Sequence, residues 1–281
     1  MTGAVPQAPA DLAAKVVLAR VGKKFVDMKR GRETVALDNI DLRISNAEFV
    51  CLLGPSGCGK STILNLIAGF EKPSSGSVAV AGSVVTRPGP DRAVVFQQPQ
   101  LFPWLTVLDN VTFGLRMAGE SAAACKDRAE RYIRIVGLSG FEKHYPYELS
   151  GGMQQRVSIA RAWISEPQML LMDEPFGALD AQTRLMMQEL LLRAWETQRT
   201  TVLFVTHDID EALFLADRIV LMSARPGQVK EEVTVGFGRP RDYGELIFEP
   251  AYVRLKQQIL ASIRVETMKV MQSQAVPREN I

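Results

Sequence analysis

The chain has 281 residues, of which 47% are apolar and 23% are charged, close to the average for soluble globular proteins. This composition excludes a mainly disordered chain, and the length allows one large domain or two small ones. The formal net charge is +2. Bulk electrostatics therefore indicates neither a nucleic-acid partner nor a membrane surface, and any anion site has to be built locally.

Cysteine and histidine usage narrows the class further. The three cysteines, Cys51, Cys58 and Cys125, include no C-x-x-C pair, and an odd count fits neither a disulfide framework nor a zinc site. The two histidines are too few for a histidine-rich metal centre. No apolar run approaches the roughly 18 residues of a membrane-spanning helix. If the protein works at a membrane, a partner has to hold it there.

The N-terminal part predicts a tail followed by a β layer. Residues 1–14 are rich in Ala and Pro, and we expect them to form a flexible tail. Two extended stretches follow within residues 16–50, and residues 29–33 separate them as a turn. This pattern predicts an antiparallel β layer.

Short apolar runs then recur along the chain and predict a parallel sheet. Such runs suit strands buried on both faces, although a buried helix segment is the alternative for any single run. Helical patterns lie between the runs, so the alternation predicts an α/β fold with crossover helices. The predicted strands cover residues 49–53, 93–96, 169–172, 201–205 and 219–222. The predicted helices cover residues 60–70, 184–198 and 208–217.

Residues 98–165 break this alternation. They contain no comparable strand run, and helical patterns at residues 105–117 and 122–136 predict an inserted helical subdomain. Near the C-terminus the apolar residues are spaced three or four apart and predict one face of a helix. These residues are Tyr252, Leu255, Ile259 and Ile263.

The glycine-rich segment of residues 54–62 fits the pattern GxxxxGK[ST] between a predicted strand and a predicted helix, the context of a phosphate-binding loop. Glycines let backbone N–H groups wrap a polyphosphate, and the helix N-terminus adds the positive end of its dipole. In this interpretation Lys60 reaches the β- and γ-phosphates of ATP, and Ser61 ligates Mg²⁺. The predicted ATP contacts are Gly54, Pro55, Ser56, Gly57, Cys58, Gly59, Lys60, Ser61 and Thr62.

Two adjacent acids end the predicted strand at residues 169–172. Parallel α/β sheets bind their ligands at this end of the strands. Asp173 is expected to act on Mg²⁺, directly or through water, and Glu174 to polarise the attacking water as general base. Together with the phosphate-binding loop, the pair predicts a P-loop nucleotide hydrolase.

A second turn that could bind an anion, Ser150-Gly151-Gly152, opens another predicted helix. A chain with one phosphate-binding loop does not need two, so we expect this turn to serve a second copy of the protein. Residues 149–156 resemble the signature motif of the ATP-binding subunits of ABC transporters, and the likeness covers about residues 16–238. The resemblance implies an α/β P-loop NTPase fold with a RecA-like parallel core, an N-terminal antiparallel β layer and an inserted helical subdomain.

The same resemblance assigns further residues to the site. Gln97 matches the Q-loop glutamine, which touches Mg²⁺ or the attacking water, and Asp180 matches the D-loop residue that reaches across a dimer. His207 matches the switch histidine at the γ-phosphate. Gln154, with Ser150, Gly151 and Gly152, belongs to the signature that would contact ATP. Phe25 is the candidate for stacking on adenine, with a place in the β-layer core as the alternative.

The resemblance also implies a domain organisation. Residues 15–97 and 166–238 would form the nucleotide-binding core with its β layer, residues 98–165 the helical signature subdomain, and residues 239–281 a C-terminal extension. One departure is Ala47, where the family usually has glycine; we expect a changed turn there without loss of chemistry.

Softer signals resemble importers. Residues 101–107 and the tail around residues 238–241 and 252–255 are similar to the group that imports nitrate, sulfonates, taurine and bicarbonate. This likeness implies a second copy or a homologous ATPase, integral permease subunits and, indirectly, a solute-binding protein as partners, at the cytoplasmic face of the cell membrane. Phe102, Trp104 and Leu105 either line the groove for a permease loop or belong to the core of the helical subdomain. The alternative function is a non-transport ABC ATPase, such as a cluster-assembly partner.

Overall fold

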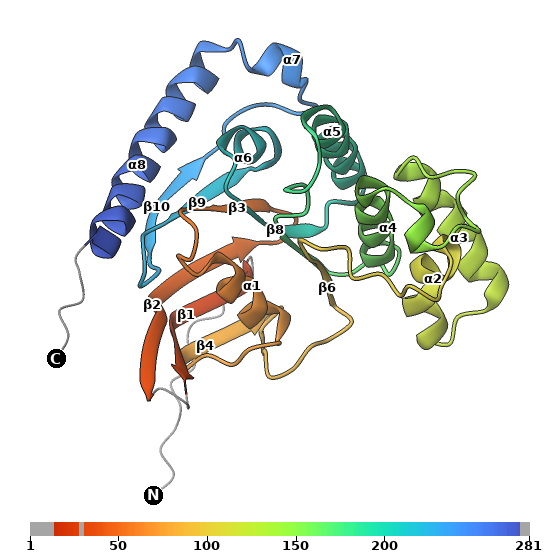
Figure 1. Ribbon diagram of the computed structural model, residues 1–281, viewed down its shortest axis with the longest axis horizontal. Coiled ribbons are helices and arrows are strands. Elements are labelled where there is room, and N and C mark those ends of the chain that lie inside the picture. The colour runs from red at the N-terminus through yellow and green to blue at the C-terminus, as the bar shows by residue number, and fades with distance from the viewer. Residues whose placement is uncertain (1–13, 28–30, 276–281) are drawn as a thin grey trace, which may run out of the picture.

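The computed structural model describes residues 14–27 and 31–275. One of its two sheets is four-stranded and antiparallel, with strand order β2-β1-β4-β5 (Figure 1). Its strands are β1 (Ala14–Asp27), β2 (Arg32–Ser45), β4 (Ser75–Val80) and β5 (Ser83–Val84). The antiparallel layer expected within residues 16–50 is therefore confirmed. The predicted tail lies outside the described residues, except for Ala14, which belongs to β1.

The second sheet is six-stranded, with order β10-β9-β3-β8-β7-β6. Neighbouring strands are parallel except β10 and β9, which are antiparallel. The strands are β3 (Phe49–Leu53), β6 (Arg92–Val95), β7 (Met169–Asp173), β8 (Thr201–Thr206), β9 (Arg218–Met222) and β10 (Val229–Thr234). Each strand predicted from a short apolar run is present. The edge strand β10 was not predicted, because Lys230, Glu231 and Glu232 interrupt its apolar residues.

Both faces of the parallel sheet are covered, which explains why its strands are apolar throughout. Helix α1 (Lys60–Ala68) packs between the two sheets, and α5 (Ala181–Gln198) and α6 (Ile209–Leu215) cover the opposite face (Figure 1). Strand β3 shows the alternation directly. Val50 and Leu52 belong to the core cluster around α1, whereas Phe49, Cys51 and Leu53 belong to the cluster around α5 and α6.

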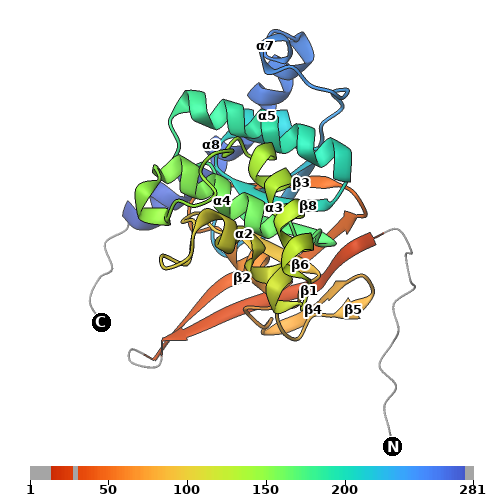
Figure 2. The same cartoon turned by 90° about the vertical axis from the view of Figure 1, so that its right-hand side faces the viewer.

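The chain between β6 and β7 is helical, as predicted. It contains α2 (Val107–Met117), α3 (Ala122–Ile135), a 3₁₀ turn (Pro146–Glu148) and α4 (Gly151–Trp163). The Thr106 and Ser121 side chains cap the N-termini of α2 and α3. The three helices pack against one another at one end of the molecule, beside the sheets (Figure 1). Viewed from that end, they lie in front of the sheets (Figure 2).

The C-terminal part returns along the outside of the sheet. A short helix, α7 (Tyr243–Leu246), leads into α8 (Pro250–Ala275), which runs beside β10 (Figure 1). The predicted face is correct: Tyr252 and Ile259 are fully buried, and Leu255 and Ile263 pack against the core. No helix within the described ranges is long and apolar enough to cross a membrane.

Candidate active site

The predicted phosphate-binding loop connects β3 to α1. Gly57 and Gly59 have positive φ angles of 76° and 103°, a conformation that glycine adopts without steric cost. Lys60 is only 6% exposed, and its Nζ donates to the carbonyl oxygens of Gly54 and Pro55 at 2.7 and 3.1 Å. The loop is therefore closed around its lysine, with the N-terminus of α1 directed at the same place.

The residues predicted to bind Mg²⁺ come from two distant parts of the chain. Ser61 Oγ donates a hydrogen bond of 3.1 Å to Asp173 Oδ1, at the end of β7. Burial raises the pKa of Asp173, as does the neighbouring charge of Glu174, whereas Ser61 and Lys60 act against this rise. A hydroxyl beside a carboxylate provides oxygen ligands of the kind that Mg²⁺ prefers. These two residues therefore fit the ion, with phosphates and water as its further ligands.

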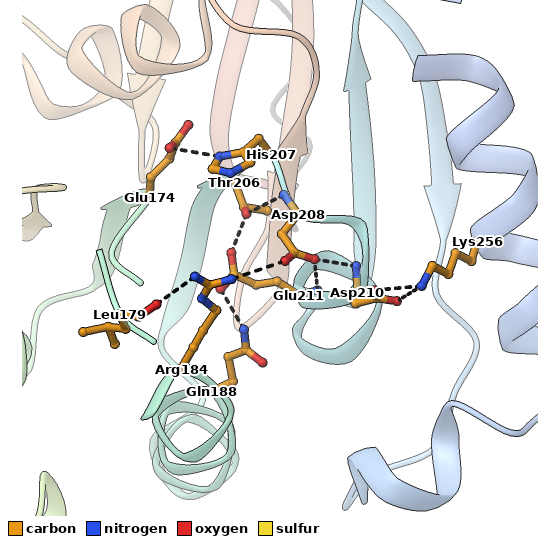
Figure 3. Close-up of polar contacts among 10 residues, drawn as sticks. All are labelled: Glu174, Leu179, Arg184, Gln188, Thr206, His207, Asp208, Asp210, Glu211 and Lys256. Carbon is orange, nitrogen blue, oxygen red and sulfur yellow. Dashed lines mark hydrogen bonds and ion pairs between the residues drawn. The ribbon is translucent and has the colours of Figure 1, made fainter. Parts of the chain in front are cut away.

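Glu174 and His207 meet at the carboxyl ends of neighbouring strands. His207 Nδ1 lies 3.1 Å from Glu174 Oε2 (Figure 3). Glu174 has a φ of 44°, a strained conformation for a residue other than glycine, and its N–H donates to the Val205 carbonyl at 2.9 Å. Strain of this kind is concentrated at functional sites. The backbone bond fixes Glu174 to β8, the strand that His207 directly follows.

Gln97 follows β6 and reaches the same corner. A Cβ atom placed on Gly177 would lie 3.9 Å from both Gln97 Nε2 and Glu174 Oε2. The chain therefore brings together six of the residues predicted for the site: Lys60, Ser61, Gln97, Asp173, Glu174 and His207.

A polar network behind His207 was not predicted. Buried Glu211 accepts hydrogen bonds from Thr206 Oγ1 and, at 2.9 Å, from Gln188 Nε2 (Figure 3). Asp208 caps α6 and lies 3.8 Å from an Arg184 nitrogen. The signal for this network in the sequence is a pair of acids, Asp210 and Glu211, in the otherwise apolar segment Ile209–Leu215.

Arg184 extends this network to the segment after Glu174. Its Nη2 donates to the Leu179 carbonyl at 2.8 Å (Figure 3). Leu179 precedes Asp180, whose side chain accepts from the Thr183 N–H and so caps α5. Hydrogen bonds from Thr183 lower the pKa of Asp180. The segment around Asp180 and the segment around His207 are thus connected through one arginine.

The second predicted anion turn lies in the helical part of the chain and contacts the segment around Leu179: a Cβ on Gly152 would lie 3.2 Å from Leu179 Cδ2. Ser150 caps α4 by accepting from the Met153 N–H at 3.3 Å, and a Cβ on Gly151 would meet no atom within 4 Å. Gln154 donates to the carbonyls of Pro146 and Leu149, so its amide supports the preceding turn. Helix α4 lies with α2 and α3, whereas α1 lies between the sheets (Figure 1). Within one chain the turn is therefore separate from the phosphate-binding loop.

Phe25 lies in β1, opposite Thr34 of β2. Its side chain is 41% exposed, and Lys23 Nζ lies 4.9 Å from the ring centroid. The alternative that Phe25 is buried in the β-layer core is therefore wrong, and one ring face has a cation beside it. Ala47, where we expected a changed turn, has a φ of 58°, in the left-handed region that favours glycine.

A phosphate-binding loop between a buried parallel strand and a helix, with two acids at the end of a nearby strand, defines a P-loop nucleoside triphosphatase. The sequence model of the ABC transporter family matches residues 37–177. The chain is 49% identical over 239 residues to an uncharacterised ABC transporter ATP-binding protein of Methanocaldococcus jannaschii, covering 85% of this chain and 88% of that protein. It belongs to the ABC transporter family and is an ABC-type ATPase.

Two cyanobacterial proteins of Synechocystis are similar over comparable lengths. Identity is 46% to the bicarbonate transport ATP-binding protein CmpD, covering 88% of both chains. It is 47% to the nitrate import ATP-binding protein NrtD, covering 84% of this chain and 90% of that one. The resemblance to the nitrate, sulfonate and bicarbonate importer group is therefore confirmed.

Solved structures agree with the fold. The dimeric structure of MJ0796, a bacterial ABC transporter cassette, has a TM-score of 0.71 and 36% identity, covering 79% of this chain and all of that one. A post-hydrolysis state of the same cassette, bound to ADP and Pi, has a TM-score of 0.70. The predicted fold class and the predicted ATPase activity are thereby confirmed.

Proposed function

We propose that the chain is the ATP-hydrolysing subunit of an importer of a small anion such as nitrate, an aliphatic sulfonate, taurine or bicarbonate. The names of similar proteins support this substrate class: bicarbonate transport, nitrate import, and aliphatic sulfonates import for a Bacillus anthracis protein that is 45% identical over 243 residues. The observation that carries the proposal is the separation of the turn at Ser150 from an otherwise assembled site.

That separation favours a head-to-tail dimer. Each ATP would lie between residues 54–62 of one copy and Ser150, Gly151, Gly152 and Gln154 of the other. Ser150 and Gly151 are exposed on the surface and free to meet a second chain. The dimeric cassette among the similar structures supports this arrangement. Asp180 would reach across the same interface, and binding of ATP would close the pair because the nucleotide completes both halves of the site.

The phosphates would be bound by the loop itself. Lys60 would neutralise the β- and γ-phosphates, and the backbone N–H groups of residues 54–62 would contact their oxygens. Ser61 and Asp173 would hold Mg²⁺, with Gln97 beside them. When bound, the ion would stabilise the negative charge of the polyphosphate. The hydrogen bond between Ser61 and Asp173 supports this assignment because it holds the two oxygen ligands together.

Glu174 would act as the general base on the attacking water. Its contact with His207 supports this role, because the histidine would orient the carboxylate, and His207 itself would contact the γ-phosphate. Adenine would stack on the exposed ring of Phe25. The protein would form no covalent bond to the nucleotide, since phosphoryl transfer depends mainly on positioning and charge stabilisation.

The helical subdomain would contact the permease. Trp104 is 71% exposed, and Phe102 packs on Phe113 with ring centroids 4.6 Å apart. An exposed aromatic residue next to a packed one suits a docking surface better than a core. The chain would then lie at the cytoplasmic face of the membrane, held there by permease subunits, with a solute-binding protein as an indirect partner.

Replacement of the base tests the catalytic assignment. Glu174→Gln is expected to bind ATP and to accumulate a closed dimer in gel filtration. Its rate of ATP hydrolysis should fall by a factor of at least roughly 100, the usual contribution of a general base. Glu189→Gln, on the outer surface of α5, is the control and should hydrolyse ATP at the wild-type rate. Hydrolysis by Glu174→Gln at the wild-type rate would refute the assignment.

Copurification tests the transport role. Extraction in mild detergent should recover integral membrane partners, and vesicles containing the complex should take up nitrate, a sulfonate or bicarbonate when ATP is supplied. Recovery of soluble partners alone would refute the assignment as a transporter subunit and favour the cluster-assembly alternative. Uptake of none of the three anions would refute the substrate class.

A further inference from the structure

The phosphate-binding loop packs against the segment that follows β9, the strand paired in parallel with β3. We name residues 222–228, from the last residue of β9 to the start of β10, the support segment. A Cβ on Gly54 would lie 3.1 Å from the Met222 carbonyl oxygen, and a Cβ on Gly227 would lie 2.0 Å from the Cys58 carbonyl oxygen. The two backbones therefore touch, and only glycine fits at the contact with Cys58.

Arg225 adds a side-chain contact to this backbone packing. Its Nε donates to the Gly57 carbonyl at 3.3 Å, and its guanidinium is otherwise exposed. Gly57 is one of the loop residues in the left-handed conformation. A change in the position of Arg225 or Gly227 would therefore be transmitted to the part of the loop that wraps the phosphates.

The support segment is in turn held by helix α8. Glu266 is 1% exposed, and its Oε2 accepts from the Ala224 N–H at 2.9 Å. Its Oε1 pairs with Lys230 at 3.0 Å and with Lys269 at 2.8 Å. Burial alone would raise the pKa of Glu266, but the bonds from Lys269, Ala224 and Lys230 lower it to about 2. The carboxylate is therefore ionised, and the bond to the support segment is charge-assisted.

The hydrogen bond from Ala224 to Glu266 is not needed merely to attach α8 to the sheet. Other residues already join α8 to β10: Gln258 Nε2 and Ser262 Oγ donate to Glu231 at 2.8 and 3.2 Å. Those contacts are to a strand, whereas Glu266 holds a backbone N–H next to Arg225. A buried ion pair is by itself weak evidence that the pair stabilises the fold. The buried position of Glu266 is explained by the contacts of Arg225 and Gly227, in the support segment, with the phosphate-binding loop.

We propose that Glu266 is a positioning residue for nucleotide binding, which acts on the phosphate-binding loop through Ala224, Arg225 and Gly227. Helix α8, outside the predicted nucleotide-binding core, thereby sets the affinity for the phosphates of ATP and ADP. Linkage requires the reverse effect: bound nucleotide stabilises the contact between α8 and the support segment.

Binding of ADP to the purified chain tests this proposal without a permease or a transported solute. Glu266→Gln keeps the shape of the side chain and removes its charge, and it should weaken ADP binding in calorimetry about fivefold, as expected for partial loss of a charge-assisted bond. The KM for ATP should rise in parallel, with kcat changed less than about twofold. Gln258→Ala, on the same helix, is the control and should keep wild-type ADP affinity.

Arg225→Ala provides a second variant that does not threaten folding, because its side chain is exposed. It should weaken ADP binding to a similar extent. Because both residues lie on one path, the double variant should bind ADP about as weakly as either single variant, not by the product of the two effects. Wild-type ADP affinity in Arg225→Ala would overturn the proposal. So would a lower melting temperature of Glu266→Gln without a change in its ADP affinity. If Glu266→Gln fails to fold, Arg225→Ala decides alone.

Discussion

The buried carboxylate of Glu211, behind His207, gives the sharpest test of the polar network in this region. Glu211 is 5% exposed and accepts hydrogen bonds from Thr206 and Gln188, which are themselves buried. Glu211→Ala removes both acceptors and leaves two buried donors without a partner. Each costs about 1–3 kcal/mol. We therefore expect Glu211→Ala to lose about 2–6 kcal/mol of unfolding free energy, a large share of the usual 5–15 kcal/mol.

Glu211→Gln separates the hydrogen bonds from the charge. The amide oxygen can accept from the Thr206 hydroxyl, and the amide N–H can donate to Gln188 Oε1 once that side-chain amide flips, so both partners stay satisfied. Burial raises the pKa of Glu211 above its ordinary value of 4.5, although the bonds from Thr206 and Gln188 act against the rise. The wild-type protein bears the cost of burying this charge at high pH, whereas Glu211→Gln does not.

The sign of the pH dependence follows from this shift. Between pH 4.5 and the raised pKa of the folded state, the unfolded chain has released the proton that the folded chain still binds. The contribution of Glu211 to stability is therefore present below pH 4.5 and is lost as the pH rises through the folded-state pKa. Glu211→Gln lacks this loss, so its stability relative to wild type should increase with pH.

Urea denaturation of the nucleotide-free chain at several pH values measures these differences. The expected order at pH about 8 is Glu211→Gln equal to or above wild type, and Glu211→Ala well below both. Parallel pH profiles for wild type and Glu211→Gln would refute the raised pKa. A Glu211→Gln variant as unstable as Glu211→Ala would refute the claim that hydrogen-bond satisfaction, not charge, holds this network together.

Two further substitutions test local features. Ala47→Gly relieves the left-handed backbone at φ 58° and should raise the free energy of unfolding by about 0.5–1 kcal/mol. A lower free energy of unfolding, measured by urea denaturation, would show that Ala47 is not strained. Tyr252→Phe removes the 2.6 Å hydrogen bond from Tyr252 to Asp210, and because Lys256 still pairs with Asp210, the cost should be about 1 kcal/mol. A loss above about 3 kcal/mol in thermal denaturation would indicate that Lys256 does not hold Asp210 alone.

The sheet could be predicted because its information is local. A strand buried on both faces must be apolar throughout, so β3 and β8 are visible as short runs such as Phe-Val-Cys-Leu-Leu. Edge strand β10 has two apolar residues, Val229 and Val233, with three charged residues between them. These charges are paired with neighbours, as Glu232 is with Arg218. The rule that detects the apolar strands therefore does not detect β10.

The candidate site was predictable to the extent that its residues form contiguous motifs. Residues 54–62 specify a loop by themselves, whereas the approach of Glu174 and His207 was expected only from the resemblance to the ABC family. Ala224 and Glu266 are 42 residues apart, and neither stands in a motif. A contact of this kind depends on where α8 is laid along the sheet, and no pattern within either segment encodes that.

Helix α8 contacts the segments behind both sides of the site. Tyr252 and Lys256, near its start, pair with Asp210, three residues after His207. Glu266, near its end, holds the support segment under the phosphate-binding loop. A helix of this length is stiff compared with the loops it holds. His207 and the phosphate-binding loop therefore cannot shift far apart unless one of these contacts breaks.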